Sequence, residues 1–280
     1  MYSDLAVEFS KQLILNKDYK RQSTKVNKFI KKDKIEILTT KSQQILNRQI
    51  GTYFSFDIPF DPILLKLQQN ILTNQLVKCL NTLFKKFNIT NINSALVVGL
   101  GNDKLTADCF GDKVIDNIMV TRHVTKSGLN IDNLCEVSAF SSGVFGVTGF
   151  ESYDIIKGIV DAIKPQITII IDTLISSSLK RLGANIQLAN VGIIPGSGVG
   201  NARKELSNNT LDTKIITIGI PFAIKTSSIL NKKIKSVDDK VLMSREIDEQ
   251  IKINAKIIGS AINKALNPKF NKKQFETFFI

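Results

Sequence analysis

Two aspartates beside strongly apolar sequence are the residues best suited to chemistry. Asp172 follows the apolar run QITIII, and Asp108 lies in the loop GLGNDKLTADCFGD, near Asp103 and Asp112. We expect Asp172 to close a buried strand, where burial disfavours an ionised carboxylate unless partners compensate. Each aspartate also has a purely structural explanation, as the cap of a following helix or as a turn residue.

A pair of close carboxylates supports two kinds of chemistry. If Asp108 and Asp172 converge, they share a proton, so that one serves as general acid while the other activates water. Alternatively, their oxygens hold a divalent metal ion. Both possibilities stay open at this point, and both depend on the two loops meeting in space.

The single histidine, His123, offers a weaker route to catalysis. In the string VTRHV it fits a packed or surface position as well as a general base. A Ser-His-Asp triad would require His123 and a serine such as Ser141 or Ser197, and the chain has no GxSxG elbow. Because the three cysteines show no metal-type spacing, we expect no zinc site of the His/Cys type.

The string PGSGVGN is a glycine-rich loop that contains Gly196, Gly198 and Gly200. Glycines let the chain turn tightly and point backbone amides at an anion. The loop lacks the Lys-Ser/Thr pair of a Walker loop, and GLGN lacks the third glycine of a dinucleotide fingerprint. We therefore expect the loop to bind substrate backbone or an oxyanion rather than a nucleotide.

Four short apolar runs, each followed by a polar loop, would position these residues. The runs are SALVVGL, CEVSAF, QITIIID and ANIQLAN. Such runs, separated by helical stretches, predict buried parallel strands whose carboxyl ends share one edge of the sheet, and ligands bind outside that edge. The sequence predicts a three-layer α/β fold with a mostly parallel sheet and helical extensions at both ends.

The rest of the sequence predicts the domain boundaries and the other strands and helices. We expect one domain over 1–280, with a core at about 61–222, an N-terminal segment 1–10 and a helical C-terminal extension 223–280. Further strands are predicted at KIEILTT and from Lys214 to Ile220, closed by Pro221. Helices are predicted from Asp4 to Asn16, from an Asp61 cap to Phe87, and over Lys113 to His123, Ser152 to Lys164, Thr173 to Leu182 and Met243 to Leu266.

Composition excludes several classes of protein. The 280 residues are 43% apolar and 22% charged, which is typical of a folded globular chain. No apolar stretch approaches the roughly 20 residues of a membrane span, and no secretory signal begins the chain. The net charge of +13 comes mostly from scattered Lys, so we expect neither membrane nor direct nucleic-acid binding. A reduced, cytoplasmic setting suits the odd number of cysteines.

Several strings between Ala95 and Pro221 resemble the germination proteases of endospore-forming bacteria. They are VVGLGN, TADCFG, VTRH, TGFESYDIIKGIV, KPQITIIIDTL, ANIQLANVGIIPGSGVGNARKELS and ITIGIP, with a further echo at SDLAVE. The resemblance implies an atypical aspartic endopeptidase with a fold like that of hydrogenase maturation proteases. Such an enzyme digests the small acid-soluble proteins that coat DNA in dormant spores, and it works as a homotetramer in the cytoplasm of the spore core.

The resemblance also implies roles for individual residues. Asp108 and Asp172 match the catalytic aspartates of the family, in which an activated water attacks the peptide carbonyl. We expect no cofactor and no metal, with a divalent ion at the aspartate pair as the minor alternative. The residues expected to bind substrate or support the site are Gly101, Asn102, Arg122, His123, Gly196, Ser197, Gly198, Gly200, Asn201 and Arg203.

The chain departs from the family pattern in places. Ala107 stands where the family usually has Pro, and Ile194 where it usually has His, although neither change removes a carboxylate. Family members are zymogens cut beside a sequence like SDLAVE, which predicts a processing bond between Asp4 and Leu5. Only four residues precede that bond, so we expect a nearly absent leader and reduced control by self-processing.

Two other functions stay open at the level of sequence. GLGN followed by TRH also occurs, at a different spacing, in peptidyl-tRNA hydrolases, for which His123 would be the base and the positive charge would meet RNA. A non-catalytic binding module of the same fold is the other possibility. The presence of both Asp108 and Asp172 argues against that module.

Overall fold

The strands of this chain form one mixed sheet, which the computed structural model describes over residues 3–9, 18–128, 131–197, 203–230 and 239–270. Within these residues nine strands pair in the order β1-β2-β3-β7-β8-β6-β4-β5, and β9 pairs with β8. The parallel pairs are β5 with β4, β4 with β6, and β6 with β8. The strands are β1 (Tyr19–Lys25), β2 (Lys31–Ile37), β3 (Gly51–Asp57), β4 (Ser94–Gly99), β5 (Glu136–Ser141), β6 (Ile167–Ser176), β7 (Asn185–Ala189), β8 (Lys214–Lys225) and β9 (Val241–Leu242).

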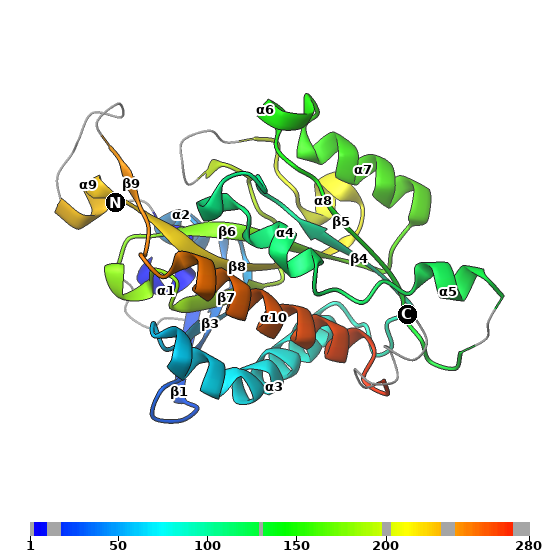
Figure 1. The fold of residues 1–280 in the computed structure, drawn as a ribbon, viewed down its shortest axis with the longest axis horizontal. Coiled ribbons are helices and arrows are strands. Elements are labelled where there is room, and N and C mark those ends of the chain that lie inside the picture. The colour runs from blue at the N-terminus through cyan, green and yellow to red at the C-terminus, as the bar shows by residue number, and fades with distance from the viewer. Residues whose placement is uncertain (1–2, 10–17, 129–130, 198–202, 231–238, 271–280) are drawn as a thin grey trace.

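Helices cover both faces of this sheet (Figure 1). On one face, α3 and α10 lie side by side and share an apolar cluster with Val97, Ile169 and Ile171. On the other face, α7 packs through Ile156 and Val160 against the intervening residues of the same strands. This alternation confirms the predicted three-layer α/β fold. The helices are α1 (Ala6–Phe9), α2 (Thr40–Leu46), α3 (Pro62–Lys86), α4 (Phe110–Ile115), α5 (Arg122–Lys126), α6 (Phe145–Thr148), α7 (Ser152–Ile163), α8 (Asn208–Leu211), α9 (Thr226–Leu230) and α10 (Ile247–Leu266).

The signals for the long helices are confirmed. The Asp61 carboxylate accepts a hydrogen bond of 2.8 Å from the Leu64 N–H, and Pro62 is the first residue of α3. α7 ends where Lys164 takes a left-handed conformation with a φ of 46°. α10 begins at Ile247, later than predicted. None of the helices in the described ranges is long and apolar enough to cross a membrane.

The N-terminal part of the chain contributes strands rather than the predicted helical extension. β1, β2 and β3 form an antiparallel meander that joins the sheet through β7. The strand predicted at KIEILTT overlaps β2, whereas β1 and β3 were missed. β1 is rich in polar residues, and alternating burial in β2 appears only at Asp33, Ile35 and Ile37. Of the predicted helix from Asp4 to Asn16, α1 is present, and residues 10–17 lie outside the described residues. The main apolar cluster includes residues of β3 and α10, so the core extends beyond the predicted 61–222.

β6 and β8 both run past the points where the sequence predicts them to stop. The helix predicted over Thr173 to Leu182 is wrong, because β6 continues to Ser176 and stays paired with β8. β8 continues through Pro221, where the register shifts between Leu174 and Ile175 of β6. Proline lacks a donor N–H and is tolerated in strands at such irregularities. Pairing between β6 and β8 therefore extends both strands past the residues at which the local sequence predicts them to end.

Two connections also differ from the prediction. β7 is antiparallel to both β3 and β8, so the loop after it leaves the opposite end of the sheet and has to fold back. The single helix predicted over Lys113 to His123 is instead α4 and α5. Between them, the Thr121 N–H donates a hydrogen bond of 3.0 Å to the Val137 carbonyl oxygen of β5, which draws the chain back to the sheet.

Candidate active site

Close packing at glycines places Asp108 beside the end of β4. The Leu100 N–H donates to the Ile171 carbonyl oxygen of β6 at 2.8 Å. A Cβ on Gly101 would lie 1.9 Å from the Asp108 carbonyl oxygen, and the φ of 121° at Gly101 suits only glycine. A Cβ on Gly111 would lie 2.2 Å from the Leu100 carbonyl oxygen. The missing side chains let the short helix that ends in Asp108, and the start of α4, pack directly against β4.

Asp172 reaches the same place from within β6 rather than from its end. Its partner residue on β8 is Gly219. Its Oδ1 accepts a hydrogen bond of 2.9 Å from the Thr173 N–H. Because Ile171 faces α3 and α10, Asp172 faces the opposite side of the sheet, the side covered by α7. The expected position at the last residue of a strand is therefore corrected.

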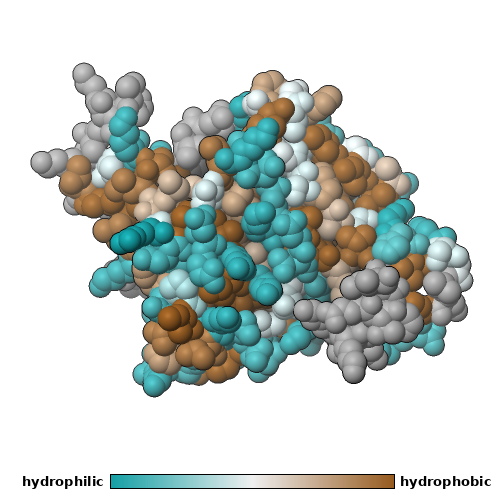
Figure 2. Space-filling model, in the orientation of Figure 1, coloured by the Kyte–Doolittle hydropathy of each residue, from teal (hydrophilic) through white to brown (hydrophobic). Residues whose placement is uncertain are grey.

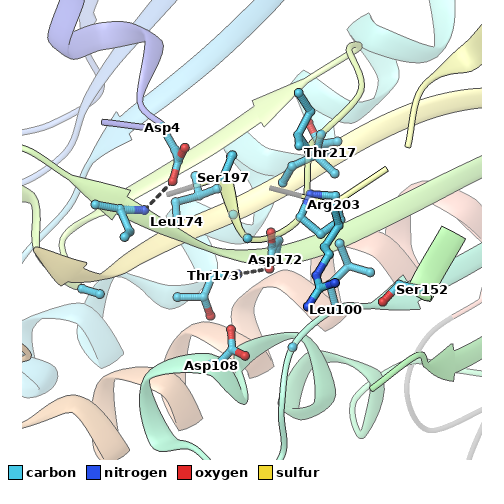
Figure 3. A pocket seen from close by; sticks show the side chains of 18 of the residues that line it. Asp4, Leu100, Asp108, Ser152, Asp172, Thr173, Leu174, Ser197, Arg203 and Thr217 are labelled. Atoms are coloured by element: carbon cyan, nitrogen blue, oxygen red, sulfur yellow. Dashed lines mark hydrogen bonds between the residues drawn. The ribbon is translucent and has the colours of Figure 1, made fainter. Parts of the chain in front are cut away.

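Both aspartates line one cavity of about 1040 Å³. Figure 3 shows the Asp172 carboxylate on its strand and Asp108 on the other side of the opening, with Asp4 and Arg203 nearby. The cavity starts at the carboxyl end of β4 and extends across Thr217 and Gly219 of β8. It thus lies partly over the face of the sheet rather than only outside its edge, and it is as large as the larger ligand sites of proteins.

The two carboxylates have raised and unequal pKa values. Burial raises the pKa of Asp108 from 3.8 to about 6, and the Asp112 carboxylate contributes to the rise. Burial raises the pKa of Asp172 well above its ordinary value, and the carboxylates of Asp108 and Asp4 raise it further. Two neighbouring carboxylates with raised pKa values are suited to share a proton, and peptide hydrolysis by water needs an acid and a base.

The segment that contains the predicted processing bond docks at this cavity. The Asp4 N–H donates to the Ile175 carbonyl oxygen at 2.8 Å, and the Ile175 N–H donates to the Asp4 carboxylate at 2.8 Å. Asp4 lines the cavity and Leu5 is fully buried beside it. Glu8 and Asp57 form ion pairs with Arg181 at 3.6 and 2.8 Å, so this arginine braces the segment instead of facing substrate. That the bond between Asp4 and Leu5 is cut stays a prediction.

The glycine-rich loop and its neighbours form a second wall of the cavity. Gly196 and Ser197 line it, as do the two departures from the family pattern, Ala107 and Ile194. Arg203 also lines it, and its guanidinium pairs with Glu151 at 3.1 Å and lies 5.2 Å from the centre of the Phe145 ring. Gly101 and Asn102 contribute from the loop after β4. The predicted site residues Gly198, Gly200 and Asn201 lie outside the described residues.

Comparison with known proteins identifies the family. A model of the germination protease family matches residues 8–241. The chain belongs to the germination protease family. It is 36% identical over 247 residues to the germination protease of Clostridium acetobutylicum, covering 84% of this chain and 74% of that protein. It is 33% identical over 298 residues to that of Priestia megaterium, covering 99% and 78%.

A solved structure is matched more distantly. A NiFe hydrogenase maturation protease of Thermococcus kodakarensis KOD1 is 15% identical, with 66% of this chain and 98% of that chain covered and a TM-score of 0.37. A score this low does not support a comparison of the two sites.

Two predicted supporting residues lie away from the cavity. Arg122 and His123 begin α5, and Arg122 forms an ion pair with Glu136, the first residue of β5. They therefore lie at the amino ends of the parallel strands, opposite the carboxyl ends that carry Asp108. The prediction that they support the site is corrected. His123 is exposed there and does not line the cavity that Asp108 and Asp172 line.

Gln187, a polar residue of the cavity, was missed at the sequence level. Gln187 of β7 lines the cavity and hydrogen-bonds the N-terminal segment. The string ANIQLAN suggested only a buried strand, although a glutamine among apolar residues was an available signal. Among the described residues, no group of three or more His, Cys, Asp or Glu side chains is arranged to hold a metal ion.

Proposed function

We propose that this chain is an endopeptidase that cuts small acid-soluble spore proteins during germination, with Asp108 and Asp172 as its catalytic pair. The observation that carries the proposal is the convergence of two carboxylates with raised, unequal pKa values in one large cavity. Membership of a protease family supports the reaction class. A peptide-sized cavity with glycine-rich walls supports an extended protein segment as the ligand.

The proposed mechanism assigns different roles to the two aspartates. The charged Asp108 takes a proton from a water molecule, and the resulting hydroxide oxygen attacks the peptide carbonyl carbon. The protonated Asp172 then donates its proton to the leaving nitrogen as the carbon–nitrogen bond breaks. This division is supported by burial and by the Asp108 and Asp4 carboxylates, which together raise the pKa of Asp172 well above its ordinary value and so favour the protonated form. No cofactor or metal is part of the proposal.

The test is cleavage of a purified small acid-soluble spore protein by wild type, Asp108→Asn and Asp172→Asn. Each variant should cut at least about a hundredfold more slowly, which is the scale of lost acid or base catalysis. Asp103→Asn is the matched control, because Asp103 is exposed in the same loop. We expect that control to cut at the wild-type rate.

Three outcomes would contradict the proposal. No specific cleavage by wild type would refute the substrate class. Wild-type cleavage by both aspartate variants would refute the mechanism. Inhibition of wild type by a chelator, reversed by a divalent ion, would replace the shared proton with a metal held by the two carboxylates.

We further propose that the chain assembles as a homotetramer in the cytoplasm of the spore core. Apolar side chains on the exposed side of α3 support assembly, since Ile63 and Leu67 are 71% and 70% exposed. Figure 2 shows this apolar area at the lower left, over the start of α3. Light scattering checks the oligomeric state, and a monomer at micromolar concentration would contradict the proposal.

A further inference from the structure

Three neighbouring strands align three residues in a row across the sheet. Asp172 of β6 is the partner of Gly219 on β8, and Gly219 is also the partner of Gln187 on β7. Residues in register on adjacent strands point to the same face, so Asp172 and Gln187 project from the same side, two strand spacings or roughly 10 Å apart. Gly219 between them has no side chain. A Cβ there would lie 2.6 Å from the Leu174 side chain, so Leu174 packs over Gly219 and a larger residue at this position would displace it.

Gln187 already binds a peptide backbone in this cavity. Its Nε2 donates to the Asp4 carbonyl oxygen at 3.1 Å, and its Oε1 accepts from the Ala6 N–H at 2.7 Å. The two bonds lie on either side of Leu5. Because Gln187 is only 9% exposed, its amide needs such partners.

The bound segment also lies along β6, as a peptide substrate would. β4 pairs with β6 only up to Ile171, so residues beyond that point face an edge that β4 leaves open. The Asp4 N–H and carboxylate bond the backbone of Ile175 on this edge. Gln187 thus donates a hydrogen bond to the Asp4 carbonyl oxygen, while the backbone of β6 bonds the N–H and the carboxylate of Asp4. Both catalytic aspartates line the cavity that contains these contacts.

We infer that Gln187 is a catalytic residue that binds the carbonyl oxygen of the peptide bond to be cut and stabilises the negative charge that forms on it. The inference deepens the proposed function and depends on it. When the water oxygen bonds to the carbonyl carbon, the carbonyl electron pair moves to the oxygen, and the Nε2–H of Gln187 donates to that oxyanion. The pair returns as the carbon–nitrogen bond breaks, and the leaving nitrogen takes the proton of Asp172.

The chemistry of a neutral amide suits this position. A guanidinium or ammonium beside the two aspartates would favour their charged forms, whereas an amide donates a hydrogen bond without opposing the raised pKa of Asp172. Within the described part of the chain, the side-chain hydrogen bonds of Gln187 go to the backbone C=O of Asp4 and the backbone N–H of Ala6. It therefore binds any peptide in the same way, and side-chain preference has to come from other parts of the cavity.

The test compares Gln187→Met and Gln187→Glu with wild type in the spore-protein cleavage assay. Methionine removes the amide at similar length, and glutamate keeps the shape and the acceptor for the Ala6 N–H but lacks the donor. Each should lower kcat by about 10²–10³-fold and change KM by less than about threefold, as expected for a donor that acts in the transition state. Gln166→Met is the matched control, because Gln166 is exposed before the start of β6, and it should leave both constants unchanged.

The outcomes separate this inference from the proposed function. Unchanged kcat in either Gln187 variant, or a rise in KM alone, would overturn the oxyanion role while leaving the aspartate mechanism intact. Failure of wild type to cut, or full activity of Asp108→Asn and Asp172→Asn, would refute the proposed function and this inference with it. If Gln187→Met does not fold, as judged by circular dichroism, the isosteric Gln187→Glu decides.

Discussion

Replacing Asp108 with Asn should stabilise the folded chain at neutral pH while it removes the proposed activity. Burial raises the pKa of Asp108 from 3.8 to about 6, so the ionised carboxylate destabilises the folded state relative to the unfolded one. At about 1.4 kcal/mol for each pH unit by which a pKa moves, the gain for a neutral amide is about 3 kcal/mol. That figure is an upper value, because Asp108 is only partly buried and solvent screens part of the effect.

The stability gained by Asp108→Asn should depend on pH in a defined direction. The folded chain binds a proton at Asp108 below about pH 6, whereas the unfolded chain binds it only below 3.8. Above pH 6 the carboxylate is charged in both states, and the full difference in the free energy of unfolding between wild type and Asp108→Asn is present. As the pH falls from 6 to 3.8, the folded wild type becomes protonated and the difference shrinks, and below both values it disappears.

Urea unfolding followed by circular dichroism, at one fixed protein concentration, measures this difference at about pH 8 and about pH 4.5. Asp132→Asn is the control, since Asp132 is exposed and distant in sequence from the cavity loops, and it should change stability by no more than about 0.5 kcal/mol. An Asp108→Asn variant that is no more stable than wild type at pH 8 would refute the argument. So would a gain of equal size at both pH values.

Three further results are expected. Gly101→Ala should lower the free energy of unfolding by on the order of 2 kcal/mol and abolish cleavage, because its Cβ would meet the Asp108 carbonyl oxygen at 1.9 Å; urea unfolding and the spore-protein assay measure both. His123→Ala should cut that protein at the wild-type rate, since His123 lies at the other end of the strands, and a large loss would revive the peptidyl-tRNA hydrolase hypothesis. A pH profile of kcat/KM should rise through about pH 6 as Asp108 ionises and fall at higher pH as Asp172 loses its proton, whereas a flat profile would contradict the assigned roles.

Local sequence signals were sufficient for part of the fold. The Asp61 cap, the first-turn Pro62 and the apolar spacing placed α3 correctly, because a helix is specified by residues three and four apart. The same holds for α7, which ends at a left-handed Lys164 before Pro165. The glycines of the loop after β4 also signalled a close approach of backbone segments, and Gly101 makes one.

Strand pairing over long distances was not visible in the sequence. The polar strands β1 and β2 exist because they pair with each other and with β3, and β3 in turn pairs with β7. The direction of β7 likewise depends on its partners, and an apolar run of five residues looks the same in either direction. For that reason the route from β7 to the cavity, which Gly196 and Ser197 line, was predicted wrongly.

The correction at Asp172 strengthens its candidacy as a catalyst. The structural alternative was a cap on a helix that would begin at Thr173, and β6 continues there instead, so no such helix exists to be capped. A carboxylate inside a buried strand destabilises the fold unless partners compensate, and here the neighbouring carboxylates of Asp108 and Asp4 make the charged form less favourable still. An apolar residue at this position would avoid that penalty. A role in folding therefore does not explain the aspartate, whereas the proposed role as general acid beside Asp108 does.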